Sequence, residues 1–249
     1  MSRRTRVDVL LVERGLAPTR AKAQALVLAG EVTSAGIRVD KPGHEIAPEA
    51  ELVVTPRRRF ASRGGDKLDG ALAAFGARFA TLEGLVAVDV GASTGGFTDC
   101  LLSRGAAKVY AVDVGYGQLD GRLREDARVV SMERTNAKDL DAGTFAEPIA
   151  LVVVDASFIG LGKLLPAIVR MLAPRGELVA LVKPQFEAGR AAVSRGRGVI
   201  RDAAVREAAI GAVRAEIAAS GLEIVAEVDS AVHGPKGNVE RFIWARRTG

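Results

Sequence analysis

Cysteine and histidine are nearly absent from this 249-residue sequence, which has one Cys and two His. A lone thiol excludes an internal disulfide, and these three side chains are too few for a Cys/His zinc site. Long hydrophobic runs are missing as well, and Asp8, Glu13 and Arg14 interrupt the N-terminal segment where a signal peptide would be apolar. These absences predict a cytoplasmic protein with no membrane-spanning segment and no metal.

Aromatic side chains make up only 4% of the chain, whereas charged residues make up 26% and are unevenly placed. Residues 1–63 hold 12 Lys and Arg against 7 Asp and Glu, and the remainder holds 23 of each sign. The basic excess therefore lies entirely in the first quarter of the chain, which is typical of a module that binds a polyanion. A solvated charged surface is the alternative, and it does not explain the segregation.

The first 56 residues predict a small α+β domain of two helices followed by short strands. Apolar residues at helical spacing after Val7 end at Gly15, and Thr19 is placed to cap a second helix that ends before Gly30. Short strands are expected around 32, 37–39 and 51–55. This module resembles the S4 RNA-binding domain in four motifs: Arg6-Val-Asp-Val-Leu-Leu-Val-Glu-Arg-Gly-Leu, Thr19-Arg-Ala-Lys-Ala, Gly30-Glu-Val and Val39-Asp-Lys-Pro-Gly.

The S4 resemblance implies that basic side chains of this domain rest against folded RNA. Its candidate phosphate contacts are Arg6, Arg20, Lys22 and Lys41. Contacts of this kind fix register and give salt-dependent affinity without reading base identity. Phe60 is the first aromatic residue, so structured RNA is a better fit than single strands stacked on aromatic rings.

A basic linker is predicted at 57–63, directly after a proline. Arg57, Arg58 and Arg59 either follow phosphates or form a solvated connector, and the sequence favours neither interpretation. Lys236, in the loop His-Gly-Pro-Lys-Gly, is a further candidate phosphate contact.

Strand and helix patterns alternate from residue 64 to 249, which predicts a doubly wound parallel α/β sheet with helices on both faces. Strands are expected at 86–90, 108–113, 129–132, 150–155, 177–183, 222–228 and 242–245, and helices at 66–76, 96–104, 163–172 and 203–219. The last two strands have no helix between them, so they should form an antiparallel hairpin at the sheet edge. A reversed last strand is typical of Rossmann-like methyltransferases.

A glycine-rich turn follows the first of these strands, in Val86-Ala-Val-Asp-Val-Gly-Ala-Ser-Thr-Gly-Gly. Its glycines allow a ligand to approach the backbone, and the next helix points free N–H groups at that ligand. Asp113 ends the second strand, where ribose hydroxyls are bound in nucleotide sites. The spacing departs from GxGxxG, which argues against a dinucleotide and favours S-adenosylmethionine. A plain strand–helix turn is the alternative, and the second acid weighs against it.

Two further strands end in charged residues, Asp155 and Lys183. Because ligands of open α/β sheets bind beyond the carboxyl ends of the strands, both side chains should reach one crevice. Burying a charged group is costly unless the group is paired or functional. Lys67 lies at the first helix and Glu240 at the start of the last strand, where surface salt bridges would be the default interpretation.

In chain order, Lys67, Asp155, Lys183 and Glu240 match the Lys-Asp-Lys-Glu tetrad of FtsJ-type ribose 2′-O-methyltransferases. Longer motifs extend the match, and the chain resembles the TlyA/haemolysin A family almost from end to end. The motifs include Ser62-Arg-Gly-Gly, Ala111-Val-Asp-Val-Gly-Tyr-Gly-Gln-Leu, Glu133-Arg-Thr-Asn, Asp155-Ala-Ser-Phe-Ile and Val182-Lys-Pro-Gln-Phe-Glu. The resemblance implies methylation of cytidine 2′-hydroxyls in ribosomal RNA or ribosomal subunits, with S-adenosylmethionine as cofactor.

Roles for individual residues follow from the chemistry that this resemblance implies. Lys183 is expected to take the proton of the ribose hydroxyl, and Lys67 to favour the neutral form of Lys183 and stabilise the developing oxyanion. Asp155 and Glu240 are expected to orient the two lysines. The candidate cofactor contacts are Asp89, Gly91, Ser93, Thr94 and Gly95, with Asp113 at the ribose and Asn136 at the adenine. Phe158 is expected either to stack near the target nucleotide or to pack in the core.

Two other classes of function compete with this interpretation. One is a non-catalytic RNA-binding factor for ribosome assembly or translation, in which the second domain only folds. The other is a membrane-lytic protein, as the haemolysin name suggests, and the lack of a strongly amphipathic cationic helix argues against it.

Overall fold

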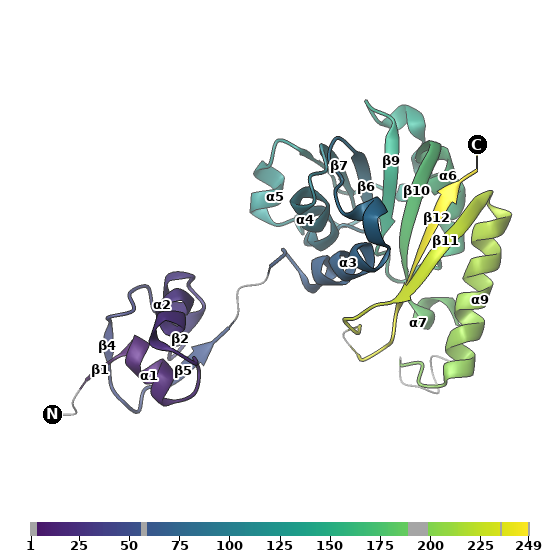
Figure 1. Cartoon of the computed structure of the whole chain (residues 1–249). Helices are drawn as coiled ribbons and strands as arrows, with labels where there is room; N and C mark the ends of the chain where they lie inside the picture. Colours follow the sequence, from purple (N-terminus) through teal and green to yellow (C-terminus); the bar gives the residue numbers. More distant parts are fainter. Residues whose placement is uncertain (1–3, 56–58, 189–198, 235, 249) are drawn as a thin grey trace. The chain divides into compact units, whose positions relative to one another are not determined.

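The computed structural model describes residues 4–55, 59–188, 199–234 and 236–248, and the chain divides into two compact units, Met1–Arg59 and Phe60–Gly249 (Figure 1). Arg57 and Arg58 therefore lie outside the described residues. Phe60 is buried in the core of the second unit, and the Ser62 hydroxyl caps its first helix. Residues 60–63, which the sequence placed in the linker, thus belong to the second unit, because an apolar ring has a core to enter there.

The first unit packs two helices against short strands. Its elements are β1 (Thr5–Arg6), α1 (Val7–Glu13), α2 (Arg20–Leu28), β2 (Val32–Ser34), β3 (Ile37–Arg38), β4 (Glu45–Ile46) and β5 (Leu52–Val54). β1 pairs with β4, and the other strands form an antiparallel sheet in the order β3-β2-β5. Thr19 caps α2 by accepting a hydrogen bond from the Lys22 amide, as predicted. Val7, Leu11, Ala23, Val27 and Val32 are fully buried between these elements.

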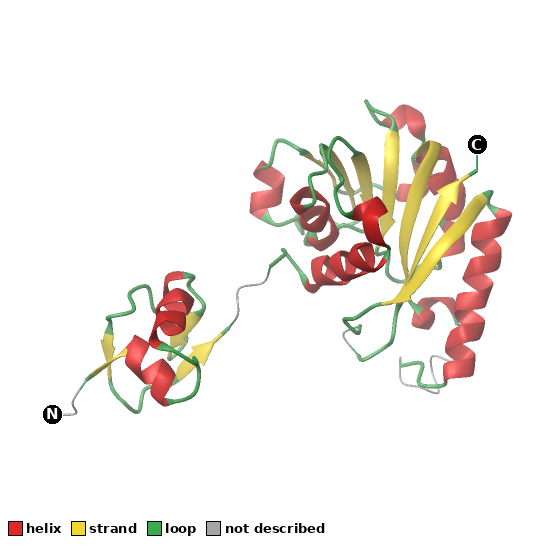
Figure 2. Cartoon of the chain, viewed as in Figure 1, coloured by secondary structure: helices red, strands yellow, loops and turns green. Residues whose placement is uncertain are grey.

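The second unit is built on a seven-stranded sheet in the order β11-β12-β10-β9-β6-β7-β8 (Figure 2). The strands are β6 (Val86–Val90), β7 (Lys108–Val112), β8 (Val129–Met132), β9 (Ile149–Val154), β10 (Leu172–Val182), β11 (Leu222–Asp229) and β12 (Arg241–Arg247). β10, β9, β6, β7 and β8 run parallel, whereas β12 is antiparallel to both of its neighbours. The predicted edge hairpin is confirmed. Chain order reverses between β6 and β9, which is where such sheets bind ligands.

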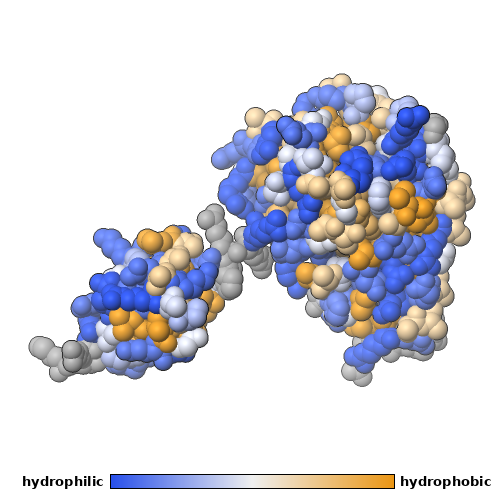
Figure 3. Space-filling model, in the orientation of Figure 1, coloured by the Kyte–Doolittle hydropathy of each residue, from blue (hydrophilic) through white to orange (hydrophobic). Residues whose placement is uncertain are grey.

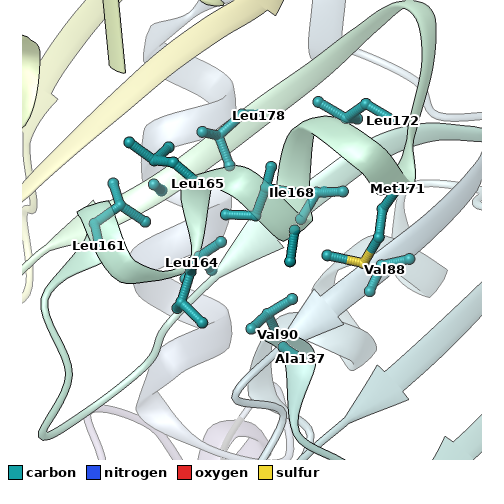
Figure 4. Close-up of a cluster of buried hydrophobic side chains, with 14 of the residues drawn as sticks. Val88, Val90, Ala137, Leu161, Leu164, Leu165, Ile168, Met171, Leu172 and Leu178 are labelled. Carbon is teal, nitrogen blue, oxygen red and sulfur yellow. The ribbon is translucent and has the colours of Figure 1, made fainter. Parts of the chain in front are cut away.

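Helices cover both faces of this sheet. They are α3 (Arg63–Ala74), α4 (Gly96–Ser103), α5 (Gly121–Glu125), α6 (Leu165–Met171), α7 (Pro184–Glu187) and α9 (Ala203–Ala219), with short 3-10 turns η1 (Gly76–Phe79), η2 (Ala137–Asp139), η3 (Ala142–Thr144) and η4 (Leu161–Lys163). The core lies in two layers. Figure 4 shows one of them, in which η4 and α6 lay Leu161, Leu164, Leu165, Ile168 and Met171 over Val88 and Val90 of β6. The other holds Leu68 of α3 and Leu101 of α4.

The observed elements differ from the expected ones mainly at their ends. β10 starts at Leu172, five residues before the predicted strand, because it pairs with Ile149 there and shifts register before Glu177. α3 starts at Arg63, where Ser62 provides the cap. Figure 3 shows hydrophilic residues over most of the visible surface of each unit, with hydrophobic residues in separate patches. In the described part of the chain, no helix combines the length and apolar character needed to span a bilayer.

Candidate active site

A cavity of about 390 Å³ opens at the carboxyl edge of the parallel strands. Each of the four loops that follow β6, β7, β8 and β9 contributes to its wall. The lining residues include Gly91, Ser93, Asp113, Val114, Gln118, Thr135, Asn136, Asp155, Ser157, Phe158, Ile159 and Leu164. Its position is the one that the strand order predicts for a ligand site.

The loop after β6 is bent so that it touches both neighbouring strand ends. Gly91 has a φ of +85°, and a methyl group there would lie 3.1 Å from the backbone of Asp155. Ser93 also has a positive φ of 48°, and its amide donates a 2.8 Å hydrogen bond to Asp113 Oδ2. Asp113 Oδ1 accepts a second hydrogen bond, from the Gly115 amide at 2.7 Å. The carboxylate is therefore fixed at the cavity wall, and its remaining lone pairs can accept hydrogen bonds from a ligand.

Asp89 does not line the cavity, contrary to the predicted cofactor contact. Neighbouring residues Val88 and Val90 face one core layer, so strand alternation turns Asp89 toward α4. Its Oδ2 accepts hydrogen bonds from the Thr98 amide at 2.9 Å and the Thr98 hydroxyl at 2.7 Å. Complete burial, together with the charges of Asp155 and Asp113, raises the pKa of Asp89 to about 7. Asp89 thus anchors the first turn of α4.

Thr94 and Gly95 are likewise absent from the cavity wall. The Thr94 carbonyl accepts a hydrogen bond from the Asp120 amide, at the start of α5. Gly95 has a φ of +94°, and a methyl group there would lie 2.3 Å from Leu123 Cδ1. These two residues hold the turn against α5, whereas Gly91, Ser93, Asp113 and Asn136 do lie at the cavity.

Lys183 and Asp155 form an ion pair where β10 and β9 end. Lys183 Nζ lies 2.7 Å from Asp155 Oδ1, and it donates hydrogen bonds to the Asp155 carbonyl at 3.2 Å and to Ser157 Oγ at 2.8 Å. Only 8% of Lys183 is exposed. Asp155 and Ser157 line the cavity, whereas Lys183 is not among its lining residues and reaches it only through these two partners.

Lys67 and Glu240 form a second, more deeply buried ion pair. Lys67 Nζ donates to Glu240 Oε2 at 2.5 Å, and the two residues are 8% and 1% exposed. A buried pair of this kind requires both charges, since removing either leaves the other uncompensated. Each lysine therefore has its own carboxylate partner, where the sequence suggested one shared cluster.

Neighbouring elements bring the two ion pairs together. Val182 pairs with Arg241 across β10 and β12, so the next residues of that register, Lys183 and Glu240, stand opposite each other. On α3, a methyl group at Gly64 would lie 3.6 Å from Asp155 Oδ2, and Lys67 follows one turn later. All four residues predicted to be catalytic thus lie at one edge of the sheet.

In the first unit, a buried carboxylate holds two of the predicted RNA contacts. Asp8 Oδ1 and Oδ2 accept from Arg6 Nε and Nη2 at 2.9 Å each, and Oδ2 also accepts from Arg20 Nε at 3.0 Å and Gln24 Nε2 at 2.8 Å. The bound Arg6 guanidinium, with Gln24 and Arg20, holds the pKa of Asp8 well below its usual range. This role of Asp8 was not predicted from the sequence. An acidic residue beside the apolar face of α1 does indicate a buried carboxylate that needs partners.

The other predicted RNA contacts that the structure describes lie at the surface. Lys22 and Lys41 are exposed in the first unit, and Lys236 is exposed in the loop between β11 and β12. Arg59 closes the first unit. In the described ranges, no group of three or more His, Cys, Asp or Glu side chains gathers to hold a metal ion.

Sequence reasoning also missed or misjudged residues beside the cavity. Ser157 was not predicted, although it lies two residues after Asp155 and holds Lys183. Gln118 lines the cavity and accepts from the Ser93 hydroxyl. Phe158 is 92% exposed and has a positive φ of 66°. The predicted alternative in which this ring packs in the core is therefore wrong. No local pattern in the sequence gives its exposure, which depends on a loop conformation.

Comparison with known proteins agrees with this geometry. The family described as FtsJ-like methyltransferase matches residues 60–247, and the S4 domain matches residues 5–52. The chain is 46% identical over 248 residues to the 16S/23S rRNA (cytidine-2′-O)-methyltransferase TlyA of Mycobacterium tuberculosis, covering 99% of this chain and 91% of that protein. It is 42% identical over 236 residues to Hemolysin A of Brachyspira hyodysenteriae, covering 94% of this chain and 97% of that one.

A solved structure also matches along the whole length. A candidate hemolysin from Streptococcus thermophilus is 41% identical, with a TM-score of 0.74, and the match covers 100% of this chain and 90% of that one. The fold of this chain is therefore similar to that of this solved structure.

Proposed function

The chain belongs to the FtsJ-like methyltransferase family, and we propose that it methylates the 2′-hydroxyl of a cytidine in ribosomal RNA, with S-adenosylmethionine as methyl donor. The observation that carries this proposal is the ion pair that Lys183 forms with Asp155, a residue of the wall of a nucleotide-sized cavity. An rRNA substrate is met in the cytoplasm, so we place the protein there. The specificity for cytidine rests on the similarity to the mycobacterial TlyA.

The cavity suits S-adenosylmethionine in size and in chemistry. Val114, Ile159 and Leu164 provide apolar walls, and its volume of about 390 Å³ lies in the range of small-molecule sites. The Asp113 carboxylate would accept hydrogen bonds from the ribose hydroxyls, and Asn136 would bind the adenine edge. When bound, this cofactor supplies a methyl group on a positively charged sulfur. Asp113 and Asp155 both favour a cation in the cavity that they line.

A ribose hydroxyl is a weak acid, so its oxygen attacks a methyl group only as the proton leaves. We assign proton removal to Lys183 Nζ, the basic atom held by Asp155 and Ser157 of the cavity wall. Lys183 Nζ donates hydrogen bonds to the Asp155 carbonyl and to Ser157 Oγ, and it forms an ion pair with Asp155 Oδ1. The neutral amine has two N–H donors and one lone pair, and that lone pair must face the ribose hydroxyl to accept its proton.

Lys67 and Glu240 support this step without exchanging the proton. The positive charge of Lys67 would stabilise the developing oxyanion. Glu240 balances that charge and holds Lys67 in place. Asp155 orients Lys183, and α3 delivers both Gly64 and Lys67 to this edge. Pre-organised charges of this kind need no rearrangement when the reaction occurs.

The first unit would dock structured RNA. Asp8 holds Arg6 and Arg20 in fixed positions while parts of both guanidiniums stay exposed, and Lys22 and Lys41 add exposed charge. Arginines fixed in this way match phosphate geometry and contribute register rather than base identity. The S4 match over residues 5–52 supports this role.

Methyl transfer from tritiated S-adenosylmethionine to ribosomal subunits and free rRNA tests the proposal. The wild type should label RNA, and Lys183→Ala should lose at least a hundredfold of the rate, since general base catalysis contributes about 10²–10⁴-fold. RNA binding by Lys183→Ala should be unchanged. Lys108→Ala is the matched control, because Lys108 pairs with Glu147 at the opposite end of the strands.

Two results would contradict the proposal. If the wild type labels neither subunits nor free RNA but still binds RNA, a non-catalytic RNA-binding factor is the better account. If Lys183→Ala labels RNA at the wild-type rate, Lys183 is not the base.

A further inference from the structure

The segment that follows β10 holds the loop that follows β9 at three places. Lys183 donates to Ser157 Oγ at 2.8 Å, and the ring of Phe186 lies 5.2 Å from that of Phe158. The third contact lies at the start of η4, where the Leu161 amide donates a 2.9 Å hydrogen bond to Glu187 Oε1. Two of these contacts involve residues of α7, a single helical turn next to the base.

The hydrogen bond from Leu161 replaces a cap that the sequence of this loop does not provide. Leu161 begins η4, and the N-cap position is Gly160, which has no side chain to accept a hydrogen bond. Glu187 supplies the acceptor from another element instead. A methyl group at Gly160 would lie 2.9 Å from Glu187 Oε2, so the glycine leaves room for the carboxylate.

The loop held in this way is the largest continuous part of the cavity wall. Asp155, Ala156, Ser157, Phe158 and Ile159 all line the cavity. At its first end the loop is fixed to the sheet, because the Asp155 amide donates to the Val90 carbonyl at 3.0 Å. Its middle contains Phe158 with a positive φ of 66°, a conformation that persists only when neighbouring contacts hold it. Glu187 fixes the second end.

We propose that Glu187 is a positioning residue of the methyltransferase site, which keeps the 155–159 loop in the shape that binds the cofactor and presents Ser157 to Lys183. The proposal rests on the proposed function, because it assumes that S-adenosylmethionine occupies this cavity. Burial, with a smaller contribution from Glu216, raises the pKa of Glu187. Because the Glu187 carboxylate is poorly solvated, the hydrogen bond from the Leu161 amide is important for stabilising its ionised form.

Three variants separate this role from a general effect of charge or stability. Glu187→Ala removes the acceptor, whereas Glu187→Gln keeps an oxygen at the same position. Glu216→Ala is the matched control, since the Glu216 side chain lies against Gly162 on the same turn but belongs to α9. Each variant is measured as the full chain for KM toward S-adenosylmethionine, kcat, KM toward RNA, and Kd for S-adenosylhomocysteine by calorimetry.

Glu187→Ala should raise KM for S-adenosylmethionine and Kd for S-adenosylhomocysteine about tenfold, the cost of one hydrogen bond to a charged group. KM for RNA should stay within about twofold, because the first unit is untouched. Glu187→Gln should recover most of the affinity, and Glu216→Ala should match the wild type. If Glu187→Ala does not fold, Gly160→Ala tests the same contact, since its methyl displaces the carboxylate and should raise the same two constants.

The inference is overturned if Glu187→Ala, or Gly160→Ala in its place, binds S-adenosylhomocysteine as the wild type does. It is also overturned if Glu187→Gln is as weak as Glu187→Ala, because loss of charge would then be the cause. These outcomes differ from failure of the proposed function, in which the wild type itself binds neither S-adenosylmethionine nor S-adenosylhomocysteine.

Discussion

The two lysines of the site are held in different ways, and the difference separates their roles. Lys183 contacts an acid and a hydroxyl that both line the cavity, so its amine is connected to the cavity through them. Lys67 is bound to a carboxylate that is only 1% exposed, so its charge is fixed. A fixed charge beside an exchangeable proton is what a proton-transfer step to the cavity requires.

The buried Lys67–Glu240 pair can be removed as a unit. Lys67→Met alone leaves the Glu240 carboxylate buried without its partner, which should cost about 3–5 kcal/mol in the free energy of unfolding. Adding Glu240→Gln removes the second charge, and most of that stability should return in urea unfolding. Methyl transfer should remain low in the double variant, because the charge beside Lys183 is gone. Transfer at the wild-type rate by the double variant would show that the pair is only structural.

Asp89 predicts a pH dependence of stability. Its pKa is about 7 in the folded protein and near the ordinary 3.8 in the unfolded chain. The folded state therefore binds a proton that the unfolded chain releases, and stability falls as the pH rises from about 4 toward 7. Asn at this position keeps an acceptor for Thr98 and has no proton to lose.

Urea unfolding at pH 5, 6, 7 and 8 measures this effect. The stability of Asp89→Asn relative to the wild type should increase with pH, by at most about 1.4 kcal/mol per unit, and level off above pH 7. A constant difference across the series would mean that Asp89 is ionised throughout.

At the level of helices and strands, much of the fold could be read from apolar periodicity. The run Val86–Val90 and the acid that ends each of two other strands were enough to predict the sheet edge that holds the site. Boundaries were less accurate where a distant partner decides them: β10 extends back to Leu172 because β9 continues beside it. The hydrogen bonds of Asp89 depend on α4, and the cap that Glu187 provides depends on η4. Because each partner belongs to another element, no local sequence pattern could predict these contacts.

In the turn between β6 and α4, close packing leaves room only for glycine at position 95. Gly95→Ala should lower the free energy of unfolding by about 1–3 kcal/mol, because the residue has a positive φ and its methyl would meet Leu123 at 2.3 Å. Gly121→Ala, at the first residue of α5, is the control, since a methyl there meets nothing within 4 Å. Thermal and urea unfolding compare the two. Equal stability of both variants would contradict the packing role assigned to Gly95.

Across the whole chain, charge and chemistry are divided between the two units. The first unit holds 11 Lys and Arg against 7 Asp and Glu and so carries most of the basic excess, and the second carries the cavity with both ion pairs. Composition alone revealed the division, whereas the residues that fix Arg6 and Arg20 became visible only in the fold. The similarity to the mycobacterial TlyA spans both units, which fits an enzyme that carries its own RNA-docking domain.

The affinity for RNA should decrease when exposed lysines of the first unit are replaced. Lys22→Gln with Lys41→Gln should weaken binding to ribosomal RNA and reduce the slope of log affinity against log salt by about one per lysine. The Kd for S-adenosylhomocysteine should not change, because the cavity belongs to the second unit. Lys108→Gln serves as the control for lost charge. An unchanged salt slope in the double variant would place the RNA elsewhere.

The most direct test of the account is the identity of the methylated nucleoside. After reaction with S-adenosylmethionine, ribosomal RNA is digested to nucleosides and analysed by mass spectrometry, with Lys183→Ala as the inactive reference. The methyl group is expected on the ribose, as 2′-O-methylcytidine, in the wild-type reaction only. A methyl group on a base, or the same product from Lys183→Ala, would contradict the assignment of this site to ribose methylation through Lys183.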